Sequence, residues 1–97
     1  MLLPAKITSE KRINIPREVI KQFNISSIEE IYIYVQNKAI KITKNFMANT
    51  QGKKIIPDCV LSLNNDNRIR ISQFILEQIG MRKTYYVEYM NYCINIY

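Results

Sequence analysis

The sequence predicts a mainly β fold with short helices, built from two similar halves that share one core. Residues 6–43 and 61–96 each read as an extended stretch, a short helix and a β-hairpin. The two segments align at an offset of 56 up to the end of the helix and at an offset of 54 in the hairpin. A half of about 40 residues buries too little apolar surface to fold alone. We therefore expect a pseudo-dimer within one chain, with the first half at 1–44, a linker at 45–58 and the second half at 59–97.

The first half is expected to begin with two short strands that lead into a helix. Residues 6–8 open the first strand, and residues 12–15 alternate polar and apolar side chains as a half-buried strand does. Residues 9–11 form a polar turn between the two strands. Pro16 is predicted as the first helical residue, a position that has no use for a backbone N–H.

The helices are predicted from apolar faces and from the residues that end them. Val19, Ile20 and Phe23 form one apolar face, and the first helix is expected to end at Asn24. In the second half, Ser72 is the predicted N-cap. The apolar face of the second helix is predicted to comprise Phe74, Ile75, Leu76 and Ile79. Gly80 aligns with Asn24, and both residue types readily adopt a positive φ, so we expect a left-handed residue after each helix.

Each half is predicted to end in a β-hairpin. The strands are expected at residues 31–35, 39–42, 85–89 and 93–97, with turns at 36–38 and near Asn91. In the first of these strands Ile31, Ile33 and Val35 take one face, while Tyr32, Tyr34 and Gln36 take the other. Residues 45–57 are polar and lack helical or strand periodicity, which is typical of a linker.

The charge of the chain favours an acidic partner. Fourteen Lys and Arg against eight Asp and Glu leave a net charge of +6, which favours a partner such as nucleic acid, although many surfaces of this charge bind nothing. Residues 1–44 contain eight basic and four acidic residues, whereas residues 61–97 contain four and three. The first half is therefore expected to make more of the contact with a polyanion.

Several classes of function are disfavoured by the residues that the chain lacks. It has two cysteines and no histidine, which disfavours a zinc site or a thiol enzyme. It has no glycine-rich phosphate loop and no carboxylate pair in an apolar setting, so we expect no enzyme activity, no catalytic residue, no metal and no cofactor. Cys59 and Cys93 are expected to be reduced thiols, with a single disulfide as the alternative. Because we see neither an export signal nor a membrane span, we expect a cytoplasmic protein without a membrane partner.

The first half resembles a known family of bacterial regulators. Residues 6–25, followed by 30–35 and 39–42, resemble the N-terminal domain of the AbrB, SpoVT and MazE superfamily of transition-state regulators and antitoxins. The shared pattern is a strand, a polar turn, an Arg before a strand that ends in Ile-Pro, a short helix, a small C-cap and a β-hairpin. Two copies in one chain resemble the arrangement of MraZ proteins. The resemblance implies a swapped-hairpin, AbrB-like β-barrel that binds DNA through basic residues near a pseudo-two-fold axis.

The resemblance also implies particular contact residues. Lys11 and Arg12 match the turn and the start of the second strand, Lys21 matches a basic position late in the helix, and Arg68 is the counterpart of Arg12 in the second half. In the family, a glycine is usual in the first turn, where this chain has Lys11.

The alternation of polar and apolar residues along the two short strands predicts the same contact surface. Ile13, Ile15, Ile69 and Ile71 are expected to face the core, which places Arg12, Asn14, Arg68 and Arg70 together in solvent if the halves pair symmetrically. Clustered guanidinium groups repel one another, and phosphate relieves that repulsion. The predicted DNA-binding residues are Lys11, Arg12, Asn14, Arg17, Lys21, Arg68 and Arg70. The alternative is an ordinary solvated face on which Arg12 and Arg68 pair with Glu10, Glu18 or Asp66.

Three further alternatives stay open. The seven tyrosines could stack single-stranded bases, although packing within hairpins is the simpler role for them. The protein could be an interaction module, or an antitoxin-like partner-binding protein, that keeps the fold without a DNA site. Antitoxins of this superfamily hold their toxin with a long extended C-terminal tail. Because the last strand is expected to end at Tyr97 without such a tail, the antitoxin is disfavoured unless residues 45–57 bind the partner. Finally, the halves could pair between chains, which would give a homodimer or a higher oligomer.

Overall fold

The computed structural model describes residues 1–24, 30–62 and 68–97. Over these ranges the protein is mainly β with two short helices. The elements in chain order are β1 (Leu3–Lys6), β2 (Ile13–Asn14), α1 (Arg17–Phe23), β3 (Glu30–Gln36), β4 (Ala39–Thr43), β5 (Cys59–Ser62), β6 (Arg70–Ile71), α2 (Gln73–Glu77), β7 (Thr84–Met90) and β8 (Cys93–Ile96).

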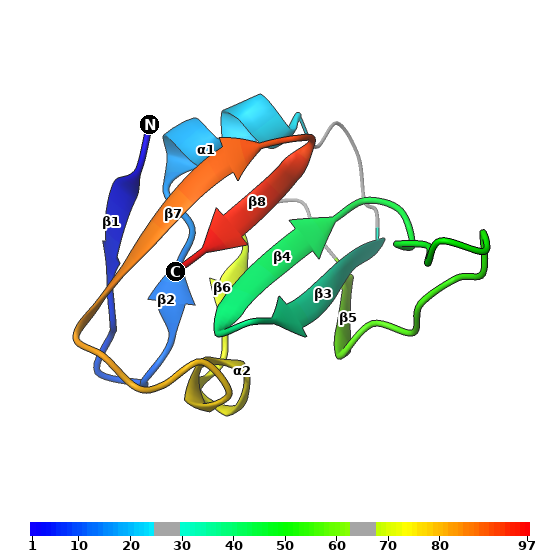
Figure 1. Cartoon of the computed structure of the whole chain (residues 1–97). Coiled ribbons are helices and arrows are strands. Elements are labelled where there is room, and N and C mark those ends of the chain that lie inside the picture. Colours follow the sequence, from blue (N-terminus) through cyan, green and yellow to red (C-terminus); the bar gives the residue numbers. More distant parts are fainter. Residues whose placement is uncertain (25–29, 63–67) are drawn as a thin grey trace.

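The strands form two layers. Six antiparallel strands make one sheet in the order β1-β7-β8-β4-β3-β5, and β2 pairs with β6 in a separate two-stranded ribbon. Figure 1 shows the ribbon behind the sheet, with α1 near one end and α2 near the other. Isoleucines from both layers belong to one buried cluster, so the core lies between the ribbon and the sheet.

Each outermost strand of the sheet pairs with the hairpin of the opposite half. Strand β1 pairs with β7, and β5 pairs with β3. Lys6 lies opposite Thr84, and Ser62 lies opposite Glu30. Ser62 follows Lys6 by 56 positions and Thr84 follows Glu30 by 54, which are the offsets that align the two halves of the sequence. The two pairings therefore have the same register, with β4 and β8 side by side between them.

The described strands do not close into a barrel, which corrects the barrel expected from the family resemblance. In the turn that follows β1, the N–H of Thr8 donates to the carbonyl of Arg12 at 2.7 Å. After this turn, β2 pairs with β6 and not with the sheet. The N–H of Ile15 continues that ribbon by donating to the carbonyl of Ile69 at 3.0 Å. Because the short ribbon strands use their backbone groups on each other, they do not join the two edges of the sheet.

The predicted left-handed residues after the helices are confirmed, whereas the helix boundaries differ in part from the prediction. Asn24 has φ 56° and donates its N–H to the carbonyl of Ile20 at 3.0 Å. Gly80 has φ 99°, although α2 itself ends at Glu77. Ser72 is the N-cap of α2 as predicted, but it makes no side-chain cap hydrogen bond. Pro16, with φ −56° and ψ 141°, precedes the first helical residue and does not occupy it.

Both predicted hairpins are present. Asn37 and Lys38 have φ 49° and 61°, and Asn91 and Tyr92 have φ 55° and 63°. Positive φ at both central residues is the mark of a type I′ turn, whose twist matches that of the flanking strands. Strand β1 lies earlier than predicted because Leu3 already pairs with β7.

Two side chains depart from their predicted environments. Phe74, expected in the apolar face of α2, is 72% exposed, because Ile75 and Leu76 alone fill the buried side of this short helix. Tyr34, on the outer face of β3, is only 2% exposed. Residues beyond the sheet must therefore cover that face.

The segment predicted as a linker provides this cover. Residues 45–57 fold into a small hairpin with a bridge between Ala48 and Lys54, drawn in green at the right of Figure 1. The hydroxyl of Tyr34 donates to the carbonyl of Ile55 at 2.8 Å and accepts from the N–H of Met47 at 3.1 Å. The segment lacks periodicity because turn hydrogen bonds and one tyrosine hold it, rather than an extended ladder.

Candidate nucleic-acid interface

The β2–β6 ribbon presents an apolar face to the core and a polar face to solvent. Ile13 lies opposite Ile71, and both are buried. The next pair along the ribbon is Asn14 opposite Arg70, and both are exposed. Strand alternation produces this separation, since successive side chains point to opposite faces. The structure thus places Asn14 and Arg70 directly beside each other.

Arg12 and Arg68 extend the polar face in opposite directions. Each lies two residues before one member of the Asn14–Arg70 pair, and the strands are antiparallel. Their Cα atoms are therefore separated by about 13 Å along the ribbon, at roughly 3.3 Å per residue. Both arginines are exposed. A two-stranded ribbon of this kind fits the major groove of duplex DNA, which is about 12 Å wide.

The turn before β2 completes one end of this face. The N–H of Lys11 donates to the carbonyl of Thr8 at 2.9 Å, and Lys11 itself has φ 60°. A shallow hollow of about 160 Å³ lies here, lined by Thr8, Ser9, Glu10, Arg12, Asn14 and Arg70. The hydroxyls of Thr8 and Ser9 were not among the predicted contacts. Their position in a polar turn next to basic residues could have identified them as candidate contacts, because hydroxyls commonly donate hydrogen bonds to phosphate.

Arg17 and Lys21 project from α1 on the side away from the core. They are four residues apart and exposed, whereas Val19 and Phe23 of the same helix are buried. At 3.6 residues per turn, the two cations share one face of the helix, opposite the buried pair. Only Pro16 separates Arg17 from the residues of the ribbon, so these cations continue the basic surface from the ribbon onto the helix.

Of the acids that were considered as alternative partners, Glu10 and Glu18 neutralise little of the charge in the described residues. Glu10 lies 3.7 Å from Arg12, and both side chains are largely exposed, so the pair is weak. Glu18 forms no ion pair within 4.0 Å in the part of the chain that the structure describes. Asp66 lies outside the described residues.

Several tyrosines are engaged within the fold. The hydroxyl of Tyr85 donates to the carbonyl of Gly80 and accepts from the N–H of Arg82, both at 3.0 Å. Tyr32 stacks on Phe46 with ring centroids 4.3 Å apart. These contacts, with that of Tyr34, favour packing over base stacking as the role of these rings.

Other kinds of site find little support in the described residues. Cys59 and Cys93 are separate thiols that are partly buried. No group of three or more His, Cys, Asp or Glu within ranges 1–24, 30–62 and 68–97 is placed to hold a metal ion. None of the helices described is long and apolar enough to cross a lipid bilayer.

Comparison with known proteins adds no assignment to these observations. No family model, no curated protein and no solved structure matches this chain.

Proposed function

We propose that this protein binds duplex DNA as a cytoplasmic bacterial transcription regulator of the AbrB/SpoVT type. The observation that carries the proposal is the exposed face of the β2–β6 ribbon, on which Arg12, Arg68 and Arg70 surround Asn14. Lys11, Arg17 and Lys21 extend this face, and we name the seven residues together the basic face. Buried isoleucines fix the ribbon from behind, so the cations are held on a rigid support rather than on a mobile loop.

The strand pairing supports the family resemblance. A chain with two swapped-hairpin halves would pair the first strand of each half with the hairpin of the other. The pairing of β1 with β7, and of β5 with β3, in equivalent registers has this form. The open sheet is a difference from the expected barrel. It leaves the polar face of the ribbon accessible, since that face points away from the sheet.

The electrostatics of the basic face favour a polyanion. Within the described ranges, Lys11, Arg12, Arg17, Lys21 and Arg70 are opposed within 4.0 Å by Glu10 alone, which lies beside Arg12. Lys and Arg side chains that neutralise phosphates release counterions from the duplex, and log K then falls by about 0.9 per contact for each tenfold rise in salt. Four to six contacts would give a slope of about −4 to −5. Asn14 adds no charge, and its amide can bond the edge of an adenine.

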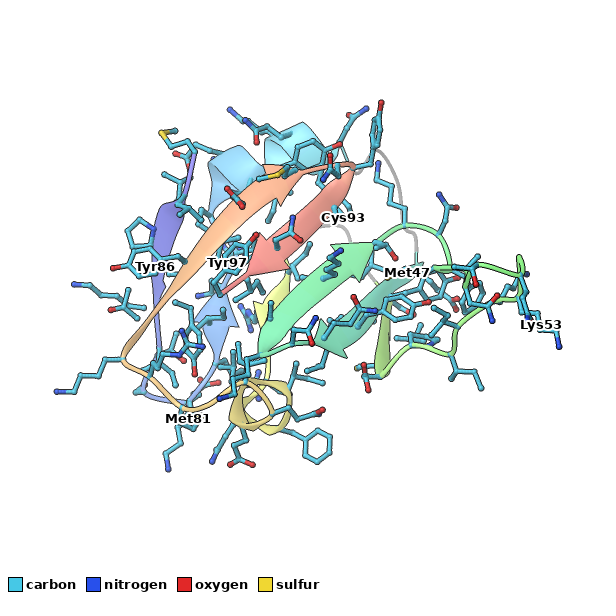
Figure 2. All side chains as sticks on the ribbon, viewed as in Figure 1. Met47, Lys53, Met81, Tyr86, Cys93 and Tyr97 are labelled. Carbon is cyan, nitrogen blue, oxygen red and sulfur yellow. The ribbon has the colours of Figure 1, made fainter. Side chains whose placement is uncertain are left out.

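The proposal is tested by fluorescence anisotropy of a labelled, mixed-sequence duplex at several salt concentrations. The wild type should bind with the slope given above, and Arg12→Ala with Arg68→Ala should reduce the magnitude of that slope by about two. The matched control is Lys53→Ala with Lys54→Ala, which also removes two positive charges. Figure 2 shows Lys53 at the far tip of the 45–57 hairpin. Equal effects of the two double variants, or no binding near 50 mM salt, would contradict the proposal.

One observation favours a second candidate, a protein-interaction module without a DNA site. Phe74 is 72% exposed on α2, a helix whose only charged residue is Glu77. A large apolar side chain in solvent is more often found at a protein contact than at a DNA contact. This candidate would take precedence if the wild type failed to bind duplex DNA at low salt.

A further inference from the structure

The two helices beside the ribbon differ in charge at matching positions. At the offset of 56, Arg17 and Lys21 on α1 correspond to Gln73 and Glu77 on α2. The offset that aligns the halves in sequence also relates Asn14 to Arg70, which lie opposite each other in the ribbon. The pseudo-symmetry of the backbone is therefore not matched by symmetry of the charge around the ribbon.

On α1, the two cations form no ion pair within the described residues, although Glu18 lies on the same helix. Arg17 and Lys21 are one turn apart, a spacing at which like charges disfavour a helix. Within the described ranges, no acidic side chain lies within 4.0 Å of either one. An anionic partner would remove this repulsion, and the exposed side of α1 would be free to receive it.

On α2, the equivalent side chains form a hydrogen bond with each other. The Nε2 of Gln73 donates to the Oε1 of Glu77 at 2.8 Å. The pair is thereby held along the helix and presents a net negative charge. A phosphate that approached α2 as another approaches α1 would meet Glu77, and like charges at close range repel.

We infer that the two helices beside the ribbon bind DNA unequally. Helix α1 contacts the phosphate backbone through Arg17 and Lys21, whereas Glu77 holds helix α2 away from it. The ribbon itself, with Arg12 towards the α2 end and Arg68 towards the α1 end, keeps the contacts proposed above. The inference rests on the proposed binding of duplex DNA and assigns the helix contact to α1.

The test compares single charge changes on the two helices with one remote change. Lys21→Glu and Lys53→Glu change the net charge equally, and Lys53 lies far from the ribbon, at the tip of the hairpin (Figure 2). Lys21→Glu should weaken binding about tenfold or more at 0.1 M salt and reduce the magnitude of the salt slope by about 0.9. Lys53→Glu should change the affinity less than about twofold, because its charge is more than a screening length of about 10 Å from the duplex. Glu77→Lys should strengthen binding about fivefold to tenfold by adding one phosphate contact.

The outcomes separate this inference from the function on which it rests. If Lys21→Glu weakens binding no more than Lys53→Glu does, or if Glu77→Ala weakens it, the two helices do not differ as inferred, although duplex binding stands. An affinity of Glu77→Lys equal to that of the wild type would overturn the role given to Glu77. If the wild type does not bind, the proposed function fails first. Thermal unfolding of each variant distinguishes a loss of affinity from a loss of the folded structure.

Discussion

Asn14 lies directly opposite Arg70 at the centre of the β2–β6 ribbon, and the two residues are 56 positions apart, the offset that aligns the halves. The central position of the ribbon is thus occupied by an amide on one strand and a guanidinium on the other. Both side chains are exposed, above the buried pair of Ile13 and Ile71. The two side chains differ in charge, so their contributions to DNA binding can be separated by experiment.

Arg70→Ala and Asn14→Ala should affect DNA binding in different ways. The first variant removes a cation and should reduce the magnitude of the salt slope by about 0.9. The second removes no charge and should leave the slope unchanged, while it alters the preference among duplexes of different base composition, since amides read base edges. Anisotropy titrations on A·T-rich and G·C-rich duplexes measure both effects. A slope that Arg70→Ala leaves unchanged would show that Arg70 makes no phosphate contact.

Lys11→Gly should stabilise the fold and weaken DNA binding. Lys11 has φ 60°, a conformation that a side chain disfavours by about 1 kcal/mol and glycine does not. In a domain of this size, that corresponds to a rise in Tm of about 4 to 8 °C. The loss of one cation from the basic face should weaken binding at the same time.

Lys38→Gly is the matched control for that variant. Lys38 has φ 61° in the β3–β4 turn, so its replacement should also raise the Tm and remove one positive charge. It lies outside the basic face, and its effect on DNA affinity should be small. Calorimetry and anisotropy on both variants give the comparison. Similar losses of affinity would mean that Lys11 acts only through net charge.

Tyr34→Phe should destabilise the protein by about 1 to 2 kcal/mol, because it leaves the carbonyl of Ile55 and the N–H of Met47 without their shared partner. The 45–57 hairpin should loosen, and trypsin should cleave faster after Lys53. Tyr97→Phe serves as the control, since its hydroxyl donates only to the half-buried Glu88, at 2.8 Å, in a solvent-exposed hydrogen bond. Urea unfolding and limited proteolysis report on the two effects. Equal stability of Tyr34→Phe and the wild type would show that the tyrosine does not anchor the hairpin.

The thiol of Cys93 should react only at elevated pH. Burial raises its pKa above the ordinary value of 9.0, while Lys41 acts in the opposite direction. The fold thus favours the protonated thiol, and the stability gained in this way is present below pH 9.0 and is lost as the pH rises through the raised pKa. The rate of alkylation in a Cys59→Ser background should reach half its maximum above pH 9.0. Lys41→Met should move that midpoint higher still, and a midpoint below the ordinary value would contradict the effect of burial.

Local chemistry was sufficient to predict most of the elements. Positive φ at Asn24 and Gly80, the two hairpins and the inward isoleucines of the ribbon all depend on interactions between near neighbours, which leave a signal in residue type and spacing. The outward position of Arg12, Asn14, Arg68 and Arg70 followed from the same alternation. The residues of the candidate basic face could therefore be predicted from the sequence, without knowledge of the fold.

The tertiary structure alone decided which strands meet. Alternation shows which side of a strand is buried, but it does not name the neighbouring strand, and the pairing of β1 with β7 joins residues about eighty positions apart. The open sheet and the cover that residues 45–57 give to Tyr34 are likewise results of long-range contact. The difference in charge between Lys21 and Glu77 is present in the sequence. Only the fold shows that the two residues lie on helices near opposite ends of one ribbon.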